Sequence, residues 1–133
     1  MRFLKQCLLP RTVASAHCDL PCGVYDPAQA RIEAESVKAV QEKYQGNEDP
    51  TFRARAIIIK EQRAELVKHH LDVLWTDYFK PPHFEKYPDL HSLFNSTIKQ
   101  ASACKQSNDP ADGQKLLDGI AQIDAVFWET KKA

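Results

Sequence analysis

The sequence lacks long apolar runs, an excess of either charge and glycine-rich stretches. No apolar run approaches the roughly 20 residues that a membrane-spanning helix needs, which excludes a transmembrane protein. Eighteen basic residues balance eighteen acidic ones, so the composition gives no support to binding of nucleic acid. Only 4 residues are glycine and 8 are proline, which excludes fibrous and low-complexity chains.

Short motifs of several common enzyme sites are absent as well. The chain has no Glu-x-x-His pair, which removes the signature of di-iron helical bundles, and no HExxH zinc motif. It has neither a phosphate-binding glycine loop nor a nucleophile elbow. What remains is the composition of one folded domain, with 133 residues of which 43% are hydrophobic and 27% charged.

Three Asp-Pro pairs, at 26–27, 49–50 and 109–110, predict where helices begin. Asp is a favoured N-cap, and Pro suits the first helical position. Together with the breaks at 46–47 and 81–82, they predict helices at residues 27–44, 50–78, 88–107 and 110–128. No alternating strand pattern of useful length competes with them. Short connections between long helices predict an all-α fold, an antiparallel four-helix bundle over residues 26–133.

The apolar stripes of the first two predicted helices each contain one charged residue, Glu33 and Arg63. The first stripe comprises Ala30, Glu33, Val37, Val40 and Tyr44, and the second comprises Phe52, Ala56, Ile59, Arg63, Leu66, His70 and Val73. Burial of a charge is costly unless the charge is paired. Glu33 and Arg63 therefore reach solvent, form a structural ion pair, or flank a functional site.

Residues 1–16 have the character of a leader that is removed. They contain three basic residues and no acidic one, and they end in Ala14-Ser15-Ala16, small residues that leader-cleaving peptidases accept. Polar residues interrupt the apolar part, which makes it weak as a secretion signal. A signal peptide and an organellar transit peptide are the alternatives. We expect a pro-segment whose removal leaves residues 17–133 as the mature domain.

Cleavage after Ala16 would make His17 the first residue and would leave three cysteines, an odd number that suits a disulfide scaffold poorly. The His17 amine, the Cys18 amide nitrogen and the thiolates of Cys18 and Cys22 then form a set of two nitrogens and two sulfurs. The His17 imidazole is available as an axial ligand. Planar geometry with such donors indicates Ni(II) or Cu(II) rather than zinc. Anionic donors stabilise the higher oxidation state, which suits one-electron chemistry. The alternatives are two ordinary thiols or a disulfide.

Residues 17–27, HCDLPCGVYDP, resemble the nickel-binding hook of the nickel-containing superoxide dismutases. The resemblance extends over the chain after Ala16 and includes ARIEAESVKAVQEK, DYFKPPHFEKYP and AQIDAVFWETKKA. It implies an enzyme that converts superoxide to oxygen and hydrogen peroxide, with one nickel ion per subunit cycling between Ni(III) and Ni(II). It also implies a homohexamer and an N-terminal extension that a peptidase removes.

The resemblance implies roles for individual residues around the hook, which we define as residues 17–25. His17, Cys18 and Cys22 would bind nickel, and Tyr25 would restrict access to it. Around them, Glu33 and Arg63 would hold the His17 imidazole, Asp19 would anchor the hook by hydrogen bonding, and Tyr78 would be a second tyrosine at the site.

Two other functions are compatible with the hook alone. A nickel or copper trafficking or storage protein could use the same ligands without turnover, and a helical interaction module could carry a disulfide there. We expect a cytoplasmic protein without a nucleic-acid or membrane partner, with export or organelle targeting by the leader as the alternatives.

Overall fold

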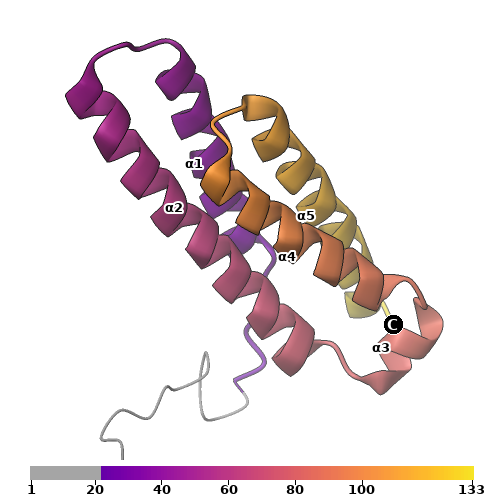
Figure 1. The fold of residues 1–133 in the computed structure, drawn as a ribbon. Helices are drawn as coiled ribbons and strands as arrows, with labels where there is room; N and C mark the ends of the chain where they lie inside the picture. The colour runs from indigo at the N-terminus through magenta and orange to yellow at the C-terminus, as the bar shows by residue number, and fades with distance from the viewer. Residues whose placement is uncertain (1–21) are drawn as a thin grey trace, which may run out of the picture.

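The computed structural model describes residues 22–133, and these residues are helical with short connections (Figure 1). Its elements, in chain order, are α1 (Ala28–Gln45), α2 (Pro50–Val73), the π-helix η1 (Leu74–Tyr78), α3 (Pro81–Lys86), α4 (Leu90–Gln106) and α5 (Pro110–Lys131). No helix within this part of the chain is long and apolar enough to cross a membrane.

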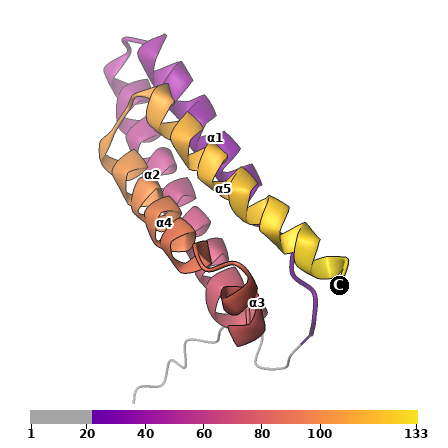
Figure 2. The same ribbon diagram turned by 90° about the vertical axis from the view of Figure 1, so that its right-hand side faces the viewer.

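The four long helices form an antiparallel bundle, which confirms the predicted fold. Helix α1 packs against α2 and α5, and α4 packs against the same two helices. The chain runs up α1, down α2, up α4 and down α5, so the α1–α2 and α4–α5 connections lie at one end (Figures 1 and 2). The start of α1, the short helix α3 and the C-terminus lie at the opposite end.

Each Asp-Pro pair lies at the start of a helix, as predicted, although the N-cap of α1 is Pro27 rather than Asp26. Asp49 accepts a hydrogen bond from the Phe52 amide at 2.9 Å, and Asp109 accepts one from the Ala111 amide at 2.9 Å. Asp26 accepts one from the Ala28 amide at 2.8 Å. These side chains satisfy amide groups that a helix leaves unpaired in its first turn.

The buried stripe of α2 agrees with the prediction at Ala56 and from Lys60 onward lies one residue further along the chain. Ile59 is exposed and Lys60 is buried, in a stripe that comprises Ala56, Lys60, Ala64, Val67 and Leu71. The Lys60 ammonium donates hydrogen bonds of 2.7 Å to the Ser107 carbonyl and to Asn108 Oδ1. The Lys60 stem therefore packs in the core while its charge meets acceptors in the α4–α5 turn. Burial lowers the pKa of this ammonium.

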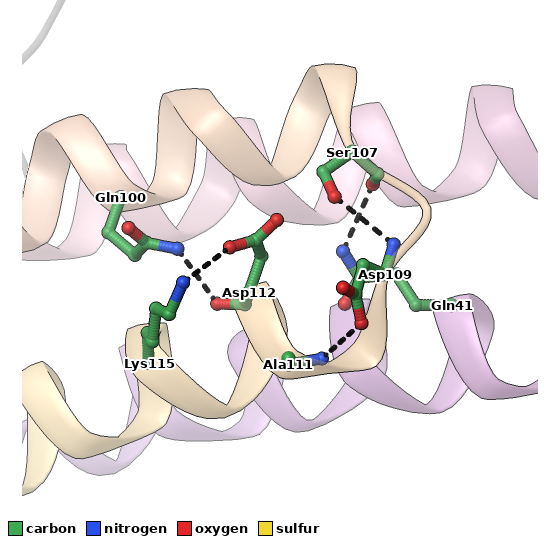
Figure 3. Close-up of polar contacts among 7 residues, drawn as sticks. All are labelled: Gln41, Gln100, Ser107, Asp109, Ala111, Asp112 and Lys115. Carbon is green, nitrogen blue, oxygen red and sulfur yellow. Dashed lines mark hydrogen bonds and ion pairs between the residues drawn. The ribbon is translucent and has the colours of Figure 1, made fainter.

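The buried stripe of α1 agrees with the prediction at Ala30 and Val37 and differs from it by one position at Ala34 and Gln41. Its buried residues are Ala30, Ala34, Val37 and Gln41, so Glu33 lies at the edge of the core. Gln41 donates a hydrogen bond to the Ser107 carbonyl at 3.0 Å, and Gln100 donates one to the Asp112 carbonyl at 3.0 Å (Figure 3). The first bond ties the α4–α5 turn to α1, and the second ties the first turn of α5 to α4.

The segment between α2 and α4 differs most from prediction. The helix predicted over 50–78 ends as α-helix at Val73 and continues as η1, closed by a bond from the Phe79 amide to the Leu74 carbonyl at 3.0 Å. Helix α3 differs from the prediction, in which Pro81 and Pro82 only end the preceding helix. Proline at the start of a helix removes no helical hydrogen bond, so the same residues also begin one.

Candidate metal centre

The hook enters the described part of the structure at Cys22, just before α1. The Cys22 side chain is exposed, and its sulfur accepts a hydrogen bond from the Val24 amide at 3.4 Å. Gly23 has a φ of +70°, a left-handed conformation that side chains disfavour, and this turn carries the chain from Cys22 towards α1. The predicted residues His17, Cys18 and Asp19 lie outside the described residues.

Cys22 and Cys104, the two cysteines in the described part of the chain, have opposite surroundings. Cys104 is buried in α4, and burial raises the pKa of its thiol to about 11. The Cys104 thiol therefore stays protonated at neutral pH, whereas a metal ligand must be a thiolate. Of the two, only the exposed Cys22 is placed to bind a metal.

The described residues supply one part of a metal site, and the first residues of the hook would supply the rest. No group of three or more His, Cys, Asp and Glu side chains within residues 22–133 converges to hold a metal ion. Cys22 supplies one thiolate, and the two residue types needed to complete a nitrogen and sulfur set stand at positions 17 and 18 of the sequence. The fit therefore rests on residues at the start of the predicted mature chain.

Tyr25 and Tyr78, which the sequence placed 53 positions apart, contact each other in the structure. Their ring centroids are 5.6 Å apart, with planes tilted by 55°. Tyr25 is half-buried and stands three residues after Cys22. The π-helix η1 ends at Tyr78, and π-helical turns occur frequently at functional sites. The hook thus rests against the bundle through this pair of rings.

Thr130 and Phe127 of α5 belong to the same cluster and were missed by the sequence analysis. The Tyr78 hydroxyl lies 2.7 Å from Thr130 Oγ1, and the Tyr78 and Phe127 ring centroids are 4.5 Å apart. The ammonium of Lys131 lies 4.9 Å from the Tyr78 ring centroid, a cation–π contact. The sequence feature that could have indicated this cluster is the number of aromatic residues in the segments DYFKPPHF and VFWET, although nothing in the sequence pairs the two segments.

Glu33 and Arg63 form an ion pair between α1 and α2. Arg63 Nη1 lies 3.2 Å from Glu33 Oε2 and 3.4 Å from Glu33 Oε1. The exposed fraction of the Glu33 side chain is 18%, against 37% for Arg63. The structural ion pair weighed in the sequence analysis is therefore present. Contact of either residue with His17 lies outside the described residues.

Comparison with known proteins identifies close relatives along the whole chain. The family model for nickel-containing superoxide dismutase matches residues 12–131. A superoxide dismutase [Ni] of Streptomyces coelicolor is 72% identical over 131 residues, which cover 98% of this chain and all of the relative. The corresponding protein of Streptomyces seoulensis is 70% identical over the same shares. A native structure of a nickel superoxide dismutase has a TM-score of 0.87 and 77% identity, and it matches 88% of this chain and 100% of its own.

Proposed function

This chain belongs to the family of nickel-containing superoxide dismutases, and we propose that His17, Cys18 and Cys22 bind its nickel ion once residues 1–16 are removed. The chain is an oxidoreductase with nickel superoxide dismutase activity. The observation that carries this function is the match of the family model over residues 12–131. When bound, nickel supplies a Ni(III)/Ni(II) couple that oxidises one superoxide to oxygen and reduces a second, with two protons, to hydrogen peroxide.

The proposed ligands are the amine and imidazole of His17, the amide nitrogen and thiolate of Cys18, and the thiolate of Cys22, with one nickel ion per subunit. The exposure of Cys22 supports this set, as does the amide group of Val24, which donates to its sulfur. Hydrogen bonds of this kind orient the ligands of a metal ion.

Removal of the leader is supported by the lengths of the matches. Curated relatives match 98% of this chain, whereas the solved native structure, matched in full, corresponds to 88% of it. Residues 17–133 make up this same share of the chain. We propose that a leader-cleaving peptidase cuts after Ala16, because only then is the His17 amine available as a donor.

Around the ligands, we assign supporting roles to neighbouring side chains. Glu33, held by Arg63, would accept a hydrogen bond from the His17 imidazole, since the free ring nitrogen of a ligand histidine is usually fixed by a carboxylate or carbonyl. Asp19 would anchor the hook. Tyr25, resting on Tyr78, would narrow the approach so that small anions reach the centre and larger reagents do not.

Association into a homohexamer is part of the proposal, and exposed apolar surface on α2 supports it. Ile57, Ile58 and Ile59 are all exposed, and Ile59 also lines a groove between α1 and α2 together with Val40 and Phe52. Exposed isoleucines beside an apolar groove are typical of a contact between proteins. Light scattering with size-exclusion chromatography measures the state directly, and a monomer at working concentration contradicts this part.

The cytoplasm is the compartment that we propose, because the ligand thiols must stay reduced, and disulfides are rare there. Cell fractionation tests this assignment, and recovery of the mature protein from an exported or organellar fraction would replace it.

Three measurements on one preparation test the proposed function. N-terminal sequencing should begin at His17, metal analysis should give one nickel per chain, and rapid-mixing assays should show fast decay of superoxide. A matched variant that retains one extra residue before His17 should bind nickel poorly and lose activity. Nickel binding without turnover in the mature protein would instead favour a trafficking or storage function.

A further inference from the structure

Thr130, in the last turn of α5, uses one oxygen for two hydrogen bonds. Its Oγ1 lies 2.6 Å from the Phe127 carbonyl oxygen and 2.7 Å from the Tyr78 hydroxyl. A carbonyl oxygen only accepts, so the single hydroxyl proton of Thr130 goes to Phe127. The bond between Tyr78 and Thr130 must then take its proton from the phenol. Tyr78 is therefore the donor and Thr130 the acceptor.

The Tyr78 ring is held in place by its neighbours, so its hydroxyl group stays beside Thr130. The Phe79 ring meets it edge-on at 4.9 Å, the His83 ring is stacked at 5.8 Å, and the Phe127 ring is tilted at 4.5 Å between centroids. These contacts come from the residue that follows η1, from α3 and from α5, and they restrict rotation of the ring away from Thr130. A phenol oxygen that donates its proton still has lone pairs with which to accept.

Tyr25 brings the hook to the same ring, at 5.6 Å between centroids. Tyr78 thus stands between the hook on one side and the end of α5 on the other. A tyrosine in this position could either donate a hydrogen bond towards the hook or only accept one. Only in the first case could it supply one of the two protons that each hydrogen peroxide requires.

We propose that Thr130 is a positioning residue of the dismutase, which accepts the hydrogen bond donated by the Tyr78 phenol and leaves Tyr78 to serve the hook only as a hydrogen-bond acceptor. Groups on the hook side, namely Tyr25 or water, are then oriented by the Tyr78 oxygen. The protons required for hydrogen peroxide come from another source than Tyr78. This inference rests on the proposed location of the metal centre at the hook, whereas the direction of the hydrogen bond does not.

NMR of the nickel-free chain labelled with ¹³C at the tyrosine Cζ atoms tests the direction of the bond. The Tyr78 signal is assigned by its loss in Tyr78→Phe. Thr130→Val removes the acceptor at nearly constant volume and should move this signal upfield, because a phenol that donates a hydrogen bond has a deshielded Cζ, whereas Thr130→Ser keeps a hydroxyl and should restore its position. An unchanged or downfield-shifted Tyr78 signal in Thr130→Val would overturn the inference whatever the metal centre proves to be.

Turnover of the mature nickel-loaded protein tests the positioning role. Thr130→Val should lower turnover about fivefold, the effect of losing one hydrogen bond of ordinary strength, and should move the high-pH limb of the rate profile. Thr130→Ser should recover both. If Thr130→Val shifts the NMR signal but leaves the rate profile unchanged, Thr130 has only a structural role and the proposal is wrong. Absence of nickel binding or turnover in the wild-type chain would instead contradict the proposed function.

Discussion

Glu33 and Arg63 join α1 to α2 through an ion pair with a distance of 3.2 Å between Oε2 and Nη1. Because more than a third of the Arg63 side chain is exposed, solvent screens this pair, and we expect it to add less than about 1 kcal/mol to stability. Its principal role would then lie in the proposed site, where a fixed carboxylate is needed.

Glu33→Gln should separate these two contributions. We expect the free energy of unfolding to change by less than about 1 kcal/mol, while turnover falls on the order of 10-fold because the carboxylate no longer holds the His17 imidazole. Glu35→Gln is the matched control, since Glu35 is on the same helix and pairs with Arg31 on an exposed face. Urea unfolding and superoxide decay provide the two measurements. Equal losses of activity in both variants would contradict the role of Glu33.

Cys22→Ser should abolish nickel binding and activity without unfolding the bundle, because Cys22 is exposed and lies before the first helix. Cys104→Ala should do the reverse, with retained nickel and a stability loss of about 1 kcal/mol from the small cavity in the core. Metal analysis and circular dichroism of both variants decide the matter. Full nickel content in Cys22→Ser would remove Cys22 from the ligand set.

The buried Cys104 thiol should make the protein less stable at alkaline pH. Its pKa is raised from 9.0 to about 11 in the folded state. Between these values the folded chain retains the thiol proton that the unfolded chain loses. The free energy of unfolding therefore decreases as the pH rises from 9 to 11. At pH 10.5 the loss amounts to about 2 kcal/mol. Under reducing conditions, urea unfolding at pH 7.5 and 10.5 should show a smaller decrease for Cys104→Ala than for the wild type. Equal decreases would contradict this prediction.

Gly113→Ala should destabilise the bundle where α5 meets α1. A Cβ atom at this position would lie 2.9 Å from the Lys38 Cα atom, which belongs to the backbone and cannot move alone. We expect a cost of about 1–3 kcal/mol, as for other overpacked sites. Gly46→Ala is the control, since the nearest atom there lies 3.8 Å away. Thermal unfolding compares the two, and equal melting temperatures would show that the helices separate more easily than their packing suggests.

The sequence was sufficient to predict the bundle, because each Asp-Pro pair marks a helix start through local chemistry alone. It failed on the register of α2, where hydrophobicity favoured Ile59 over Lys60. The register is decided by the Ser107 carbonyl, which accepts a hydrogen bond from the Lys60 ammonium. Ser107 lies in a turn 47 residues further along the chain. No local pattern contains that acceptor.

The candidate site could likewise be predicted only in part. Local motif and resemblance pointed to Tyr25 and Tyr78, and the structure brings their rings together. Thr130 could not be predicted, because its role depends on the hydroxyl oxygen of Tyr78, 52 residues away in the chain. The roles predicted for His17, Cys18 and Asp19 stay predictions.

Tyr78 contacts Tyr25, near the beginning of the described chain, and Thr130, three residues before Ala133. Both ends of the described chain therefore lie at the same end of the bundle. An affinity tag or fluorescent fusion attached after Ala133 would therefore crowd the hook, and one attached before His17 would block its amine. The turn between α1 and α2, at the far end of the bundle (Figure 1), is the place to insert a label for purification or imaging.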